Sequence, residues 1–198
     1  MRLDPAGWPF VGSLAAVAAL AAWWSPWAAV VVLIPLLFTL NFFRDPERAI
    51  PDDPQAIVSP ADGRIIRADR DRVSIFMNVF DVHVCRTPVG GRIVDVTRSP
   101  GKFLAAMRDD ASEHNERVAI VVQPPSGPPL RFVLVAGLIA RRILCRVAPS
   151  ATLRAGDRVG IIRFGSRVDV DLPAGAIPSV AVGQRVVSGE SVIARRTP

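Results

Sequence analysis

Charged residues are absent from a long stretch near the start of the chain. In 198 residues, no Asp, Glu, Lys or Arg occurs between Asp4 and Arg44, a gap of 39 residues. Cysteine is scarce as well, with only Cys85 and Cys145, which excludes a disulfide-stapled fold and fits a reducing compartment. Half of the residues are hydrophobic, which excludes an intrinsically disordered chain. The chain is long enough for one globular core and short for two.

The uncharged gap is too long for a single membrane-spanning helix. A helix of that length would extend about 58 Å, roughly twice the hydrocarbon thickness of a bilayer. Ser25-Pro26 divides the gap into two apolar runs, because proline interrupts a helix. We therefore predict a membrane-associated helical hairpin over residues 1–43. Its aromatic anchors at the membrane interfaces would be Trp8, Trp23, Trp24 and Trp27.

Two alternatives to a spanning hairpin stay open. A cleaved signal peptide has one short apolar core, whereas this apolar region is much longer. The two runs, at roughly 17 residues each, would also fit a hairpin that lies in the interface without crossing it. Whether the hairpin spans the membrane or lies in its interface, both of its ends fall on one side of the membrane. Arg44 and Arg48 favour the cytoplasmic side of the cell membrane under the positive-inside rule.

Residues 44–198 are predicted to form one domain whose basic residues are nearly all arginine. The chain carries 23 arginines and a single lysine, Lys102, with a formal net charge of +6. Guanidinium groups suit bidentate contacts with phosphate, so a basic domain tethered to a bilayer most simply faces anionic phospholipid. Nucleic acid is not predicted as a partner, because the arginines are scattered and no aromatic and basic binding motif occurs. A merely solvated arginine-rich surface is the alternative.

Short runs rich in Val and Ile predict that this domain is mainly β. The runs alternate with period two and are separated by turn signals such as Gly90-Gly91. We predict a compact barrel or sandwich with short hairpins, and one short helical segment at residues 102–107. The stretch Val182 to Glu190 resembles the hairpins of biotin and lipoyl carriers, in architecture only, because no lysine stands at its tip. The predicted strands are 63–68, 72–77, 82–85, 92–96, 117–122, 130–135, 142–147, 167–172 and 191–194.

The two histidines are the first candidates for chemistry. Strand alternation predicts that Asp81, His83 and Cys85 share one face, which is either catalytic or holds a histidine satisfied by a carboxylate. His114 lies in a second polar cluster. A metal site is not predicted, because the cysteines are 60 positions apart and no paired His/Cys spacing typical of zinc occurs.

A carboxylate and a hydroxyl each stand beside a glycine in two further segments. Asp62 precedes Gly63 in the segment Ser59 to Gly63, ahead of a predicted strand. Ser166 directly follows Gly165, ahead of another. Taken alone, Asp-Gly and Gly-Ser are ordinary turn dipeptides.

Taken together, these segments resemble the phosphatidylserine decarboxylase family in its short prokaryotic form. Five matches in one order, following an apolar hairpin and spread over most of the chain, make the resemblance specific. The matching segments are Asn41 to Arg48, Ser59 to Gly63, Asp81 to Gly90, Asn115 to Arg117, and Gly165-Ser166.

The resemblance implies a proenzyme that cuts itself between Gly165 and Ser166. The serine hydroxyl attacks the preceding carbonyl, which glycine leaves accessible. β-Elimination of the resulting ester leaves a β chain, 1–165, and an α chain, 166–198, that begins with a pyruvoyl group made from the serine. That covalent group acts without a metal or pyridoxal phosphate: it forms a Schiff base with the substrate amine and accepts the electrons released as CO₂ departs. The expected reaction converts phosphatidylserine to phosphatidylethanolamine in phospholipid biosynthesis.

The resemblance also implies roles for individual residues. Larger bacterial members use an Asp-His-Ser arrangement for self-cleavage, and Asp62 matches their aspartate. His83 matches the first of two family histidines, whereas Arg86 stands in place of the second, so the general base for cleavage stays open. The predicted catalytic residues are Asp62, His83, Gly165 and Ser166, and the predicted substrate-binding residues are Arg86, His114 and Asn115. The α and β chains would form a heterodimer, and a higher homo-oligomer stays open because family members often dimerise.

Two other functions stay open on the residues alone. A membrane-anchored serine peptidase would use Ser166 with Lys102 as its base. A tethered β module without catalytic activity would use neither residue. Both alternatives predict one intact chain, whereas the decarboxylase interpretation predicts two polypeptides.

Overall fold

The computed structural model describes residues 2–101, 114–137, 142–163 and 166–196. The chain divides into two compact units, Met1–Glu47 and Arg48–Pro198. The first contains the uncharged gap, and the second contains every predicted site residue.

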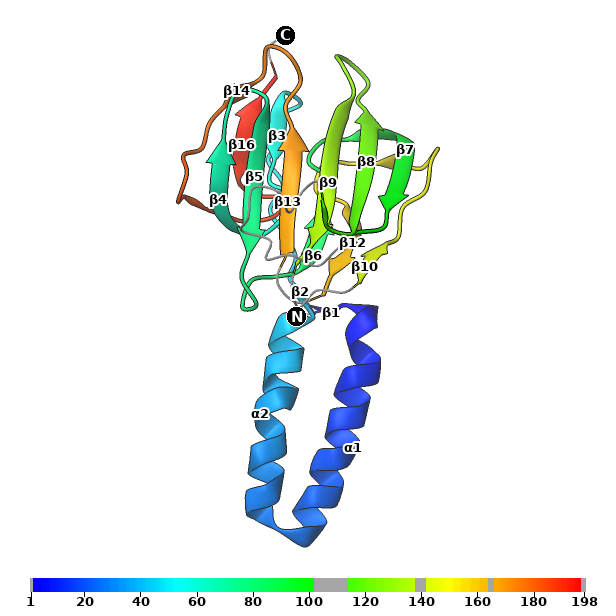
Figure 1. Ribbon diagram of the computed structural model, residues 1–198, viewed down its shortest axis with the longest axis vertical. Coiled ribbons are helices and arrows are strands. Elements are labelled where there is room, and N and C mark those ends of the chain that lie inside the picture. Colours follow the sequence, from blue (N-terminus) through cyan, green and yellow to red (C-terminus); the bar gives the residue numbers. More distant parts are fainter. Residues whose placement is uncertain (1, 102–113, 138–141, 164–165, 197–198) are drawn as a thin grey trace. The chain divides into compact units, whose positions relative to one another are not determined.

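The first unit is a pair of apolar helices, α1 (Trp8–Trp24) and α2 (Pro26–Phe42), joined at Ser25 (Figure 1). Pro26 opens α2, where its fixed φ and missing N–H are tolerated. At the other end of the pair, β1 (Arg2–Leu3) pairs with β2 (Arg44–Asp45), and the 3₁₀ turn η1 (Pro5–Gly7) leads into α1. These elements confirm the predicted helical hairpin.

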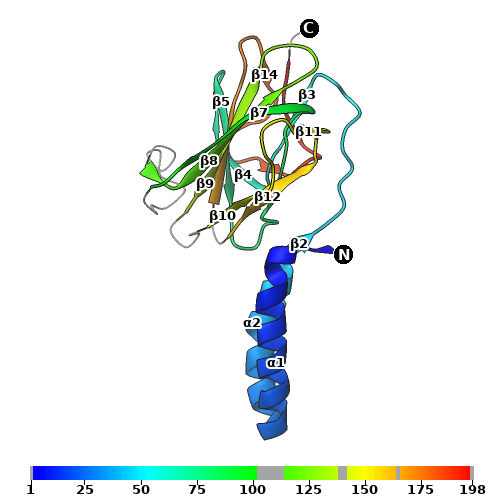
Figure 2. The ribbon, with the colours of Figure 1, turned by 90° about the vertical axis from the view of Figure 1, so that its right-hand side faces the viewer.

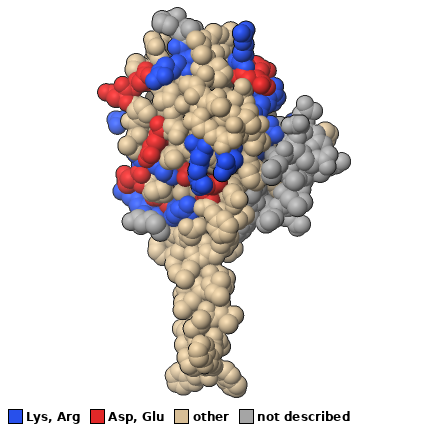
Figure 3. All heavy atoms as spheres, turned by 90° about the vertical axis from the view of Figure 1, so that its left-hand side faces the viewer, with Lys and Arg blue, Asp and Glu red and all other residues tan. Residues whose placement is uncertain are grey.

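Nearly all of the helical surface is exposed. Trp23 and Trp24, beside the turn between the helices, are 94% and 89% exposed. Figure 3 displays no charged side chain along the helices on the face in view. The segment Pro5–Trp24 is long and apolar enough to cross a membrane, whereas α2 is a shorter apolar helix of 17 residues. An exposed apolar surface of this kind suits a lipid environment.

The second unit contains one large and two small antiparallel sheets. In the large sheet the strands, in chain order, are β4 (Gly63–Ala68), β5 (Arg72–Met77), β7 (Gly91–Ser99), β8 (Arg117–Gln123), β9 (Leu130–Ala136), β11 (Thr152–Leu153), β13 (Ser166–Asp171) and β15 (Arg185–Val186). The small sheets contain β3 (Ala56–Val58), β6 (Val84–Arg86), β10 (Ile143–Cys145), β12 (Arg158–Ile162), β14 (Ile177–Pro178) and β16 (Val192–Arg195).

The sheets form an open sandwich. The large sheet has the order β11-β7-β8-β9-β13-β5-β4-β15, and the small sheets have the orders β10-β12-β6 and β14-β16-β3. Both small sheets lie on one face of the large sheet (Figures 1 and 2). Because the large sheet ends at β11 and β15 without closing, the predicted mainly β domain takes its sandwich form rather than a closed barrel.

The core lies between these layers. Alternate side chains of the large sheet point inward, among them Ile75, Ile120 and Val168, and all three are fully buried. They belong to one cluster with Ile57 of β3 and Ile162 of β12, which are buried equally. This apolar contact fixes the small sheets against the large one.

The opposite face of the large sheet holds a buried ion pair beside the predicted cleavage site. Arg167 Nε donates to Asp169 Oδ1 at 2.6 Å, and Arg167 Nη2 donates to Ser74 Oγ at 3.0 Å. The side chains of Arg167 and Asp169 are 3% and 1% exposed. Strand alternation thus sends Ser166 toward the core and Arg167 away from it.

The predicted strands agree best where a period-two pattern lies between clear turns. The predictions 63–68 and 72–77 coincide with β4 and β5. The strand predicted at 82–85 instead starts at Val84, so Asp81 and His83 precede it and alternation does not describe their faces. Asp81, His83 and Cys85 are all buried, because their segment passes between the two layers. The shared-face prediction assumed a strand through all three residues, and only Cys85 lies in one.

Some elements escaped prediction. β12 has a glycine in its middle, which weakens a strand pattern; a Cβ at Gly160 would lie 2.1 Å from the Leu144 carbonyl oxygen, so only glycine fits. The two-residue strands are too short for a period to be visible. The predicted helical segment at 102–107 lies outside the described residues.

Replacing Arg167 should test how much the buried ion pair stabilises the sheet. We expect Arg167→Met to lower the free energy of unfolding by about 3–5 kcal/mol, because the buried Asp169 carboxylate loses the Arg167 guanidinium that donates to it. The matched control is Arg72→Met: Arg72 pairs with Asp171 at 2.8 Å, but the two side chains are 30% and 27% exposed. Its expected cost is about 1 kcal/mol or less. Equal costs for the two variants in urea unfolding of the full chain would contradict this prediction.

Candidate active site

Ser166 is the first residue of a strand at the centre of the large sheet. β13 pairs with β5 on one side and β9 on the other, and Ser166 stands opposite Met77 and Ala136 (Figure 1). Its side chain is fully buried, and its hydroxyl donates to Met77 Sδ at 3.1 Å. Sulfur is a weak acceptor. The hydroxyl is therefore held in place without a strong hydrogen bond.

His83 is fully buried and its ring orientation is set by its own chain. Its Nδ1 lies 2.9 Å from the Asp81 carbonyl oxygen. Because a carbonyl oxygen only accepts, Nδ1 carries a proton, and in a neutral ring Nε2 would be the basic nitrogen. Asp81 is itself fixed, since Asp81 Oδ2 accepts from the Asn78 N–H at 2.8 Å and Asp81 Oδ1 from Arg185 Nη2 at 2.6 Å.

The chain crosses between the two layers at two neighbouring places, and these crossings relate His83 to Ser166. Residues 78–83 connect β5 to β6, while β12 ends at Ile162 in the small sheet and β13 begins at Ser166 in the large one. β5 adjoins β13 in the large sheet, and β6 adjoins β12 in a small one. The Ile162 N–H donates to the His83 carbonyl at 3.3 Å. The segment that ends in Ser166 thus starts beside His83. Gly165 lies outside the described residues.

Asp62 is part of a polar cluster that joins three distant segments. Arg48 Nη2 donates to both carboxylate oxygens of Asp62, at 2.8 and 2.9 Å. The Ser188 N–H donates to Asp62 Oδ1 at 2.8 Å. Gly63 follows with a φ of +151°, and a Cβ there would lie 2.1 Å from the Phe76 carbonyl oxygen, so the Asp62-Gly63 turn requires glycine.

Three residues predicted to be catalytic are therefore near one end of the sandwich but not linked. Among the described residues, the Ser166 hydroxyl bonds to Met77 and makes no hydrogen bond with Asp62 or His83. Asp62 adjoins Gly63 at the start of β4, and β4 is separated from β13 by β5 alone. The Cα atoms of Gly63 and Ser166 are thus two strand spacings apart, about 10 Å.

The residues predicted to bind substrate occupy different environments. Asn115 is fully buried, and its Nδ2 donates to the carbonyl of Ala136, the register partner of Ser166, at 2.7 Å. Arg86 is buried, and its Nη1 donates to the Gly156 carbonyl at 2.9 Å. His114 is exposed. Asn115 thus lies close to Ser166, whereas Arg86 holds the loop that contains Gly156.

Two residues of the site were not singled out from the sequence. Met77 ends β5 and is the contact of Ser166, but nothing in the local pattern distinguishes it from a core methionine. Arg48 does lie in a matched segment, Asn41 to Arg48, and that position was the available signal. Its side chain is 11% exposed, so its pair with Asp62 is shielded from water.

Burial and charge both act on Cys85. Removal from water raises the pKa of the Cys85 thiol, and the negative charge of Asp62 raises it further. The thiol is fully buried and points its Sγ toward the His83 carbonyl at 3.6 Å. Cys85 is therefore a neutral core residue, not a nucleophile. Among the described residues, no group of three or more His, Cys, Asp or Glu side chains is arranged to hold a metal ion.

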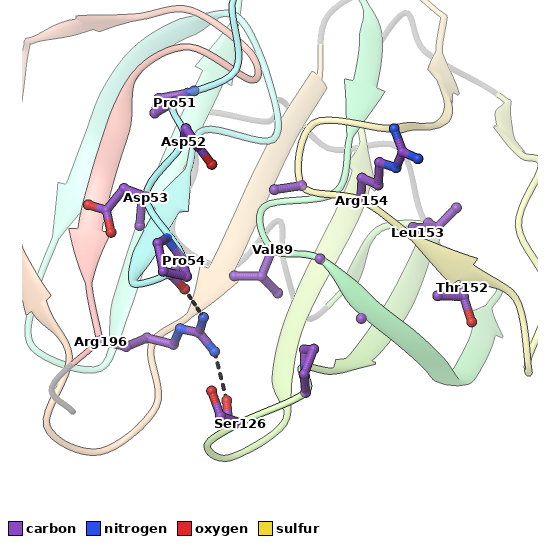
Figure 4. Close-up of a pocket in the computed structure, with 15 residues that line it drawn as sticks. Pro51, Asp52, Asp53, Pro54, Val89, Ser126, Thr152, Leu153, Arg154 and Arg196 are labelled. Carbon is purple, nitrogen blue, oxygen red and sulfur yellow. Dashed lines mark hydrogen bonds between the residues drawn. The ribbon is translucent and has the colours of Figure 1, made fainter.

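Two pockets lie at opposite ends of the large sheet. A pocket of about 470 Å³ adjoins the Ser166 end, because its lining includes Gly63, Asn78 and Asp81. A second pocket of about 530 Å³ includes Ser126 of the β8–β9 loop, at the Asp171 end of the sheet. Figure 4 shows Arg196 reaching across the second pocket to the carbonyls of Pro54 and Ser126. The lining of this second pocket includes none of the predicted site residues.

Comparison with known proteins gives one family over most of the chain. Residues 36–194 match the family model described as phosphatidylserine decarboxylase. A phosphatidylserine decarboxylase proenzyme of Desulfotalea psychrophila is 48% identical over 82% of this chain and 81% of its own length. The proenzyme of Oleidesulfovibrio alaskensis is 47% identical over 98% of this chain and 94% of its own. That of Neisseria gonorrhoeae is 44% identical over 96% and 77%.

The contrast between the two cysteines is open to direct measurement. At pH 8 we expect iodoacetamide to label half-buried Cys145 and to leave Cys85 unlabelled, because only the thiolate reacts and the raised pKa keeps Cys85 protonated. After unfolding in guanidinium chloride, both should react. Peptide mass spectrometry identifies the labelled residue. Equal labelling rates in the folded protein would show that Cys85 is accessible and ionised.

Proposed function

Because the chain belongs to the phosphatidylserine decarboxylase family, we propose that it is a self-processing phosphatidylserine decarboxylase. It would cut itself between Gly165 and Ser166 and retain, at position 166, a pyruvoyl group made from the serine. Its reaction would convert phosphatidylserine to phosphatidylethanolamine and CO₂, a step of phospholipid biosynthesis. The observation that carries the proposal is the burial of Ser166 at the head of β13, between β5 and β9.

Self-cleavage uses atoms of the chain itself and one water molecule. Ser166 Oγ attacks the Gly165 carbonyl carbon, the peptide C–N bond breaks, and an ester with a free amine on residue 166 results. Loss of the proton on Cα of residue 166 expels the Gly165 carboxylate and leaves a carbon–carbon double bond. This enamine becomes an imine, and water replaces the nitrogen, which leaves as ammonia. The products are a chain ending at Gly165 and a chain beginning with a carbonyl group.

His83 is proposed to handle the proton in cleavage. In its neutral form the ring would offer Nε2 as a base, since Nδ1–H is directed at the Asp81 carbonyl. The hydrogen bond between Ile162 and the His83 main chain ties this residue to the segment that precedes the bond to be cut. The weak Ser166–Met77 contact leaves the hydroxyl easy to redirect toward a base. Asp62 would act indirectly, by holding Arg48 and the Ser188 N–H at the same end of the sheet.

The surroundings of Ser166 fit a reactive carbonyl. Such a group supplies an electron sink for loss of CO₂ from an amino acid headgroup. Position 166 is shielded from water, and its two register partners, Met77 and Ala136, bring no amine or carboxylate against it. Asn115 donates a hydrogen bond to the Ala136 carbonyl and so holds the end of β9 beside position 166. The chain's own residues would orient the headgroup and exclude bulk water there.

The apolar helices support a location at the membrane, where the lipid substrate resides. We propose that they insert into the cell membrane and that residues 44–198 act on its cytoplasmic side, in contact with anionic phospholipid. The α chain, 166–198, and the β chain, 1–165, would stay together as a heterodimer. The rival serine peptidase requires Lys102, which lies outside the described residues, and the rival non-catalytic module requires an uncut chain.

Replacing the serine tests self-cleavage directly. We expect the wild-type protein to yield two polypeptides whose summed mass equals the full chain plus water minus ammonia. Ser166→Ala should remain one chain, because no hydroxyl attacks the Gly165 carbonyl. Intact-mass measurement and a denaturing gel read both results. Ser126→Ala, in the β8–β9 loop, is the matched control and should process as the wild type does. An uncut wild-type chain that is inactive would refute the proposed function.

Replacing each histidine by glutamine tests whether His83 acts in self-cleavage, with the exposed His114 as the control. We expect His83→Gln to slow self-cleavage by about 100-fold or more, because a proton acceptor is lost. His114→Gln, at an exposed position, should process within about twofold of the wild-type rate. Densitometry of the precursor band over time measures both rates. If both variants process alike, another group acts as the base.

A further inference from the structure

Two arginines stand directly opposite one another at the Ser166 end of the large sheet. Arg64 of β4 is the register partner of Arg185 of the edge strand β15. Cross-strand partners have Cβ atoms about 5 Å apart, and like charges in this position destabilise a sheet. Both side chains are exposed, so nothing in the core requires two cations here. An anion between them would offset their repulsion.

Both arginines line the pocket of about 470 Å³ described above. Arg64 Nη1 donates to the Gly183 carbonyl at 3.0 Å, and Arg185 Nη2 donates to Asp81 Oδ1 at 2.6 Å. Each guanidinium has five N–H donors and can therefore bind an anion as well. Among the described residues of the lining, Asp81 is the one carboxylate, and both its oxygens already accept hydrogen bonds. The pocket therefore has an excess of positive charge and of donors.

The rest of the lining is apolar enough for a lipid. Ile66, Phe76 and Phe80 contribute to the pocket, and Phe80 is 64% exposed on the Asn78–Asp81 turn. A free phosphate ion would gain nothing from these side chains. A phosphodiester that continues into glycerol and acyl groups would bury apolar surface against them. The combination of paired guanidinium groups and apolar walls thus matches a phospholipid headgroup.

The pocket also adjoins the proposed reaction site. Met77, which contacts Ser166, directly precedes Asn78 of the pocket lining. Asp81 joins the two places, because its carboxylate binds Arg185 and its carbonyl accepts from His83. Arg64, Phe76 and Arg167 are register partners in one row, so the pocket lies on the face of the sheet opposite the Ser166 side chain. At this end β5 ends at Met77 and β13 begins at Ser166, and the two faces adjoin there. An arginine side chain and a phosphoserine headgroup together span the two strand spacings to position 166.

We propose that Arg64 and Arg185 form the site that binds the phosphodiester of the lipid substrate. This proposal rests on the proposed function, which supplies a phospholipid with an amino acid headgroup. Arg64 lies in the β chain and Arg185 in the α chain, so both products of self-cleavage contribute to one binding site. Bidentate guanidinium contacts would fix the phosphate while the serine part of the headgroup extends toward position 166.

Steady-state kinetics with a soluble substrate test this site. Arg64→Gln, in protein shown by mass to be fully processed, should raise the KM for dihexanoyl-phosphatidylserine by about tenfold or more, since hydrogen bonds to charged groups are the strong ones. The kcat should stay within about twofold. Arg64→Lys should give an intermediate KM, because it keeps the charge without the planar fork. Arg70→Gln removes the same charge in the β4–β5 turn and should change neither constant.

An unchanged KM in Arg64→Gln would overturn the proposal. If the same variant also binds phosphatidylglycerol vesicles more weakly, the arginines contact the membrane surface and not the substrate.

Binding to the uncut Ser166→Ala chain separates this proposal from the proposed function. Calorimetric titration should show that Arg64→Gln weakens binding of dihexanoyl-phosphatidylserine and dihexanoyl-phosphatidic acid, but not of dihexanoylglycerol, which lacks phosphate. If the wild type releases no CO₂ while this difference persists, the proposed function fails and the phosphate site stands. If the wild type is active and the three lipids respond alike to the substitution, the phosphate site fails alone.

Discussion

The position of β13 between two neighbouring strands is the constraint on which the rest of this structure depends. All six of its residues have register partners in both β5 and β9, so the strand is held along its whole length on both sides. Its first residue is Ser166, the one at which a new chain end would arise. A chain end there would not fray as an ordinary terminus does, because two ladders and the buried Arg167–Asp169 pair hold the residues that follow it. The sheet thus supplies the rigidity that a covalent bond would otherwise give.

The same constraint would keep the chain assembled after the proposed cut before Ser166. Residues 166–198 contribute β13 to the middle of the large sheet, β15 to its edge, and β14 and β16 to a small sheet. The turn at Ser188 and Gly189 also binds the Asp62 segment. The Ser188 N–H donates to Asp62 Oδ1, and the Gly189 N–H donates to the Ser59 carbonyl at 2.8 Å. Release of this part would expose the interior of both layers. The cost of separating the chains is therefore similar to the cost of unfolding the sandwich.

The sequence predicted best what depends on nearby residues. β4 and β5 were located to the residue because period two is set by the pleat, and the helical hairpin was evident because charge is absent over the gap. Ser166 and Asp62 were predicted as site residues by resemblance to a family. Their partners were not, because the Ser188 N–H is 126 positions from Asp62 and the contact arises only from sheet order. The burial of Asp81 and His83 was missed for a related reason: a segment that connects two layers outside a strand shows no alternating hydrophobic pattern.

The nearly complete use of arginine gains a chemical reason from this geometry. A carbonyl that condenses with a substrate amine would also condense with a neutral lysine amine that reached it, whereas guanidinium stays protonated and presents a planar fork of donors. Arg64 and Arg185 lie at the same end of the sheet as Ser166, where the proposed site would use positive charge to bind phosphate and a competing amine would interfere. The Asp81 carboxylate accepts a hydrogen bond from Arg185, and the Asp81 main-chain carbonyl accepts one from the His83 ring. One residue thus aligns the group that would bind the phosphate with the group that would move the proton.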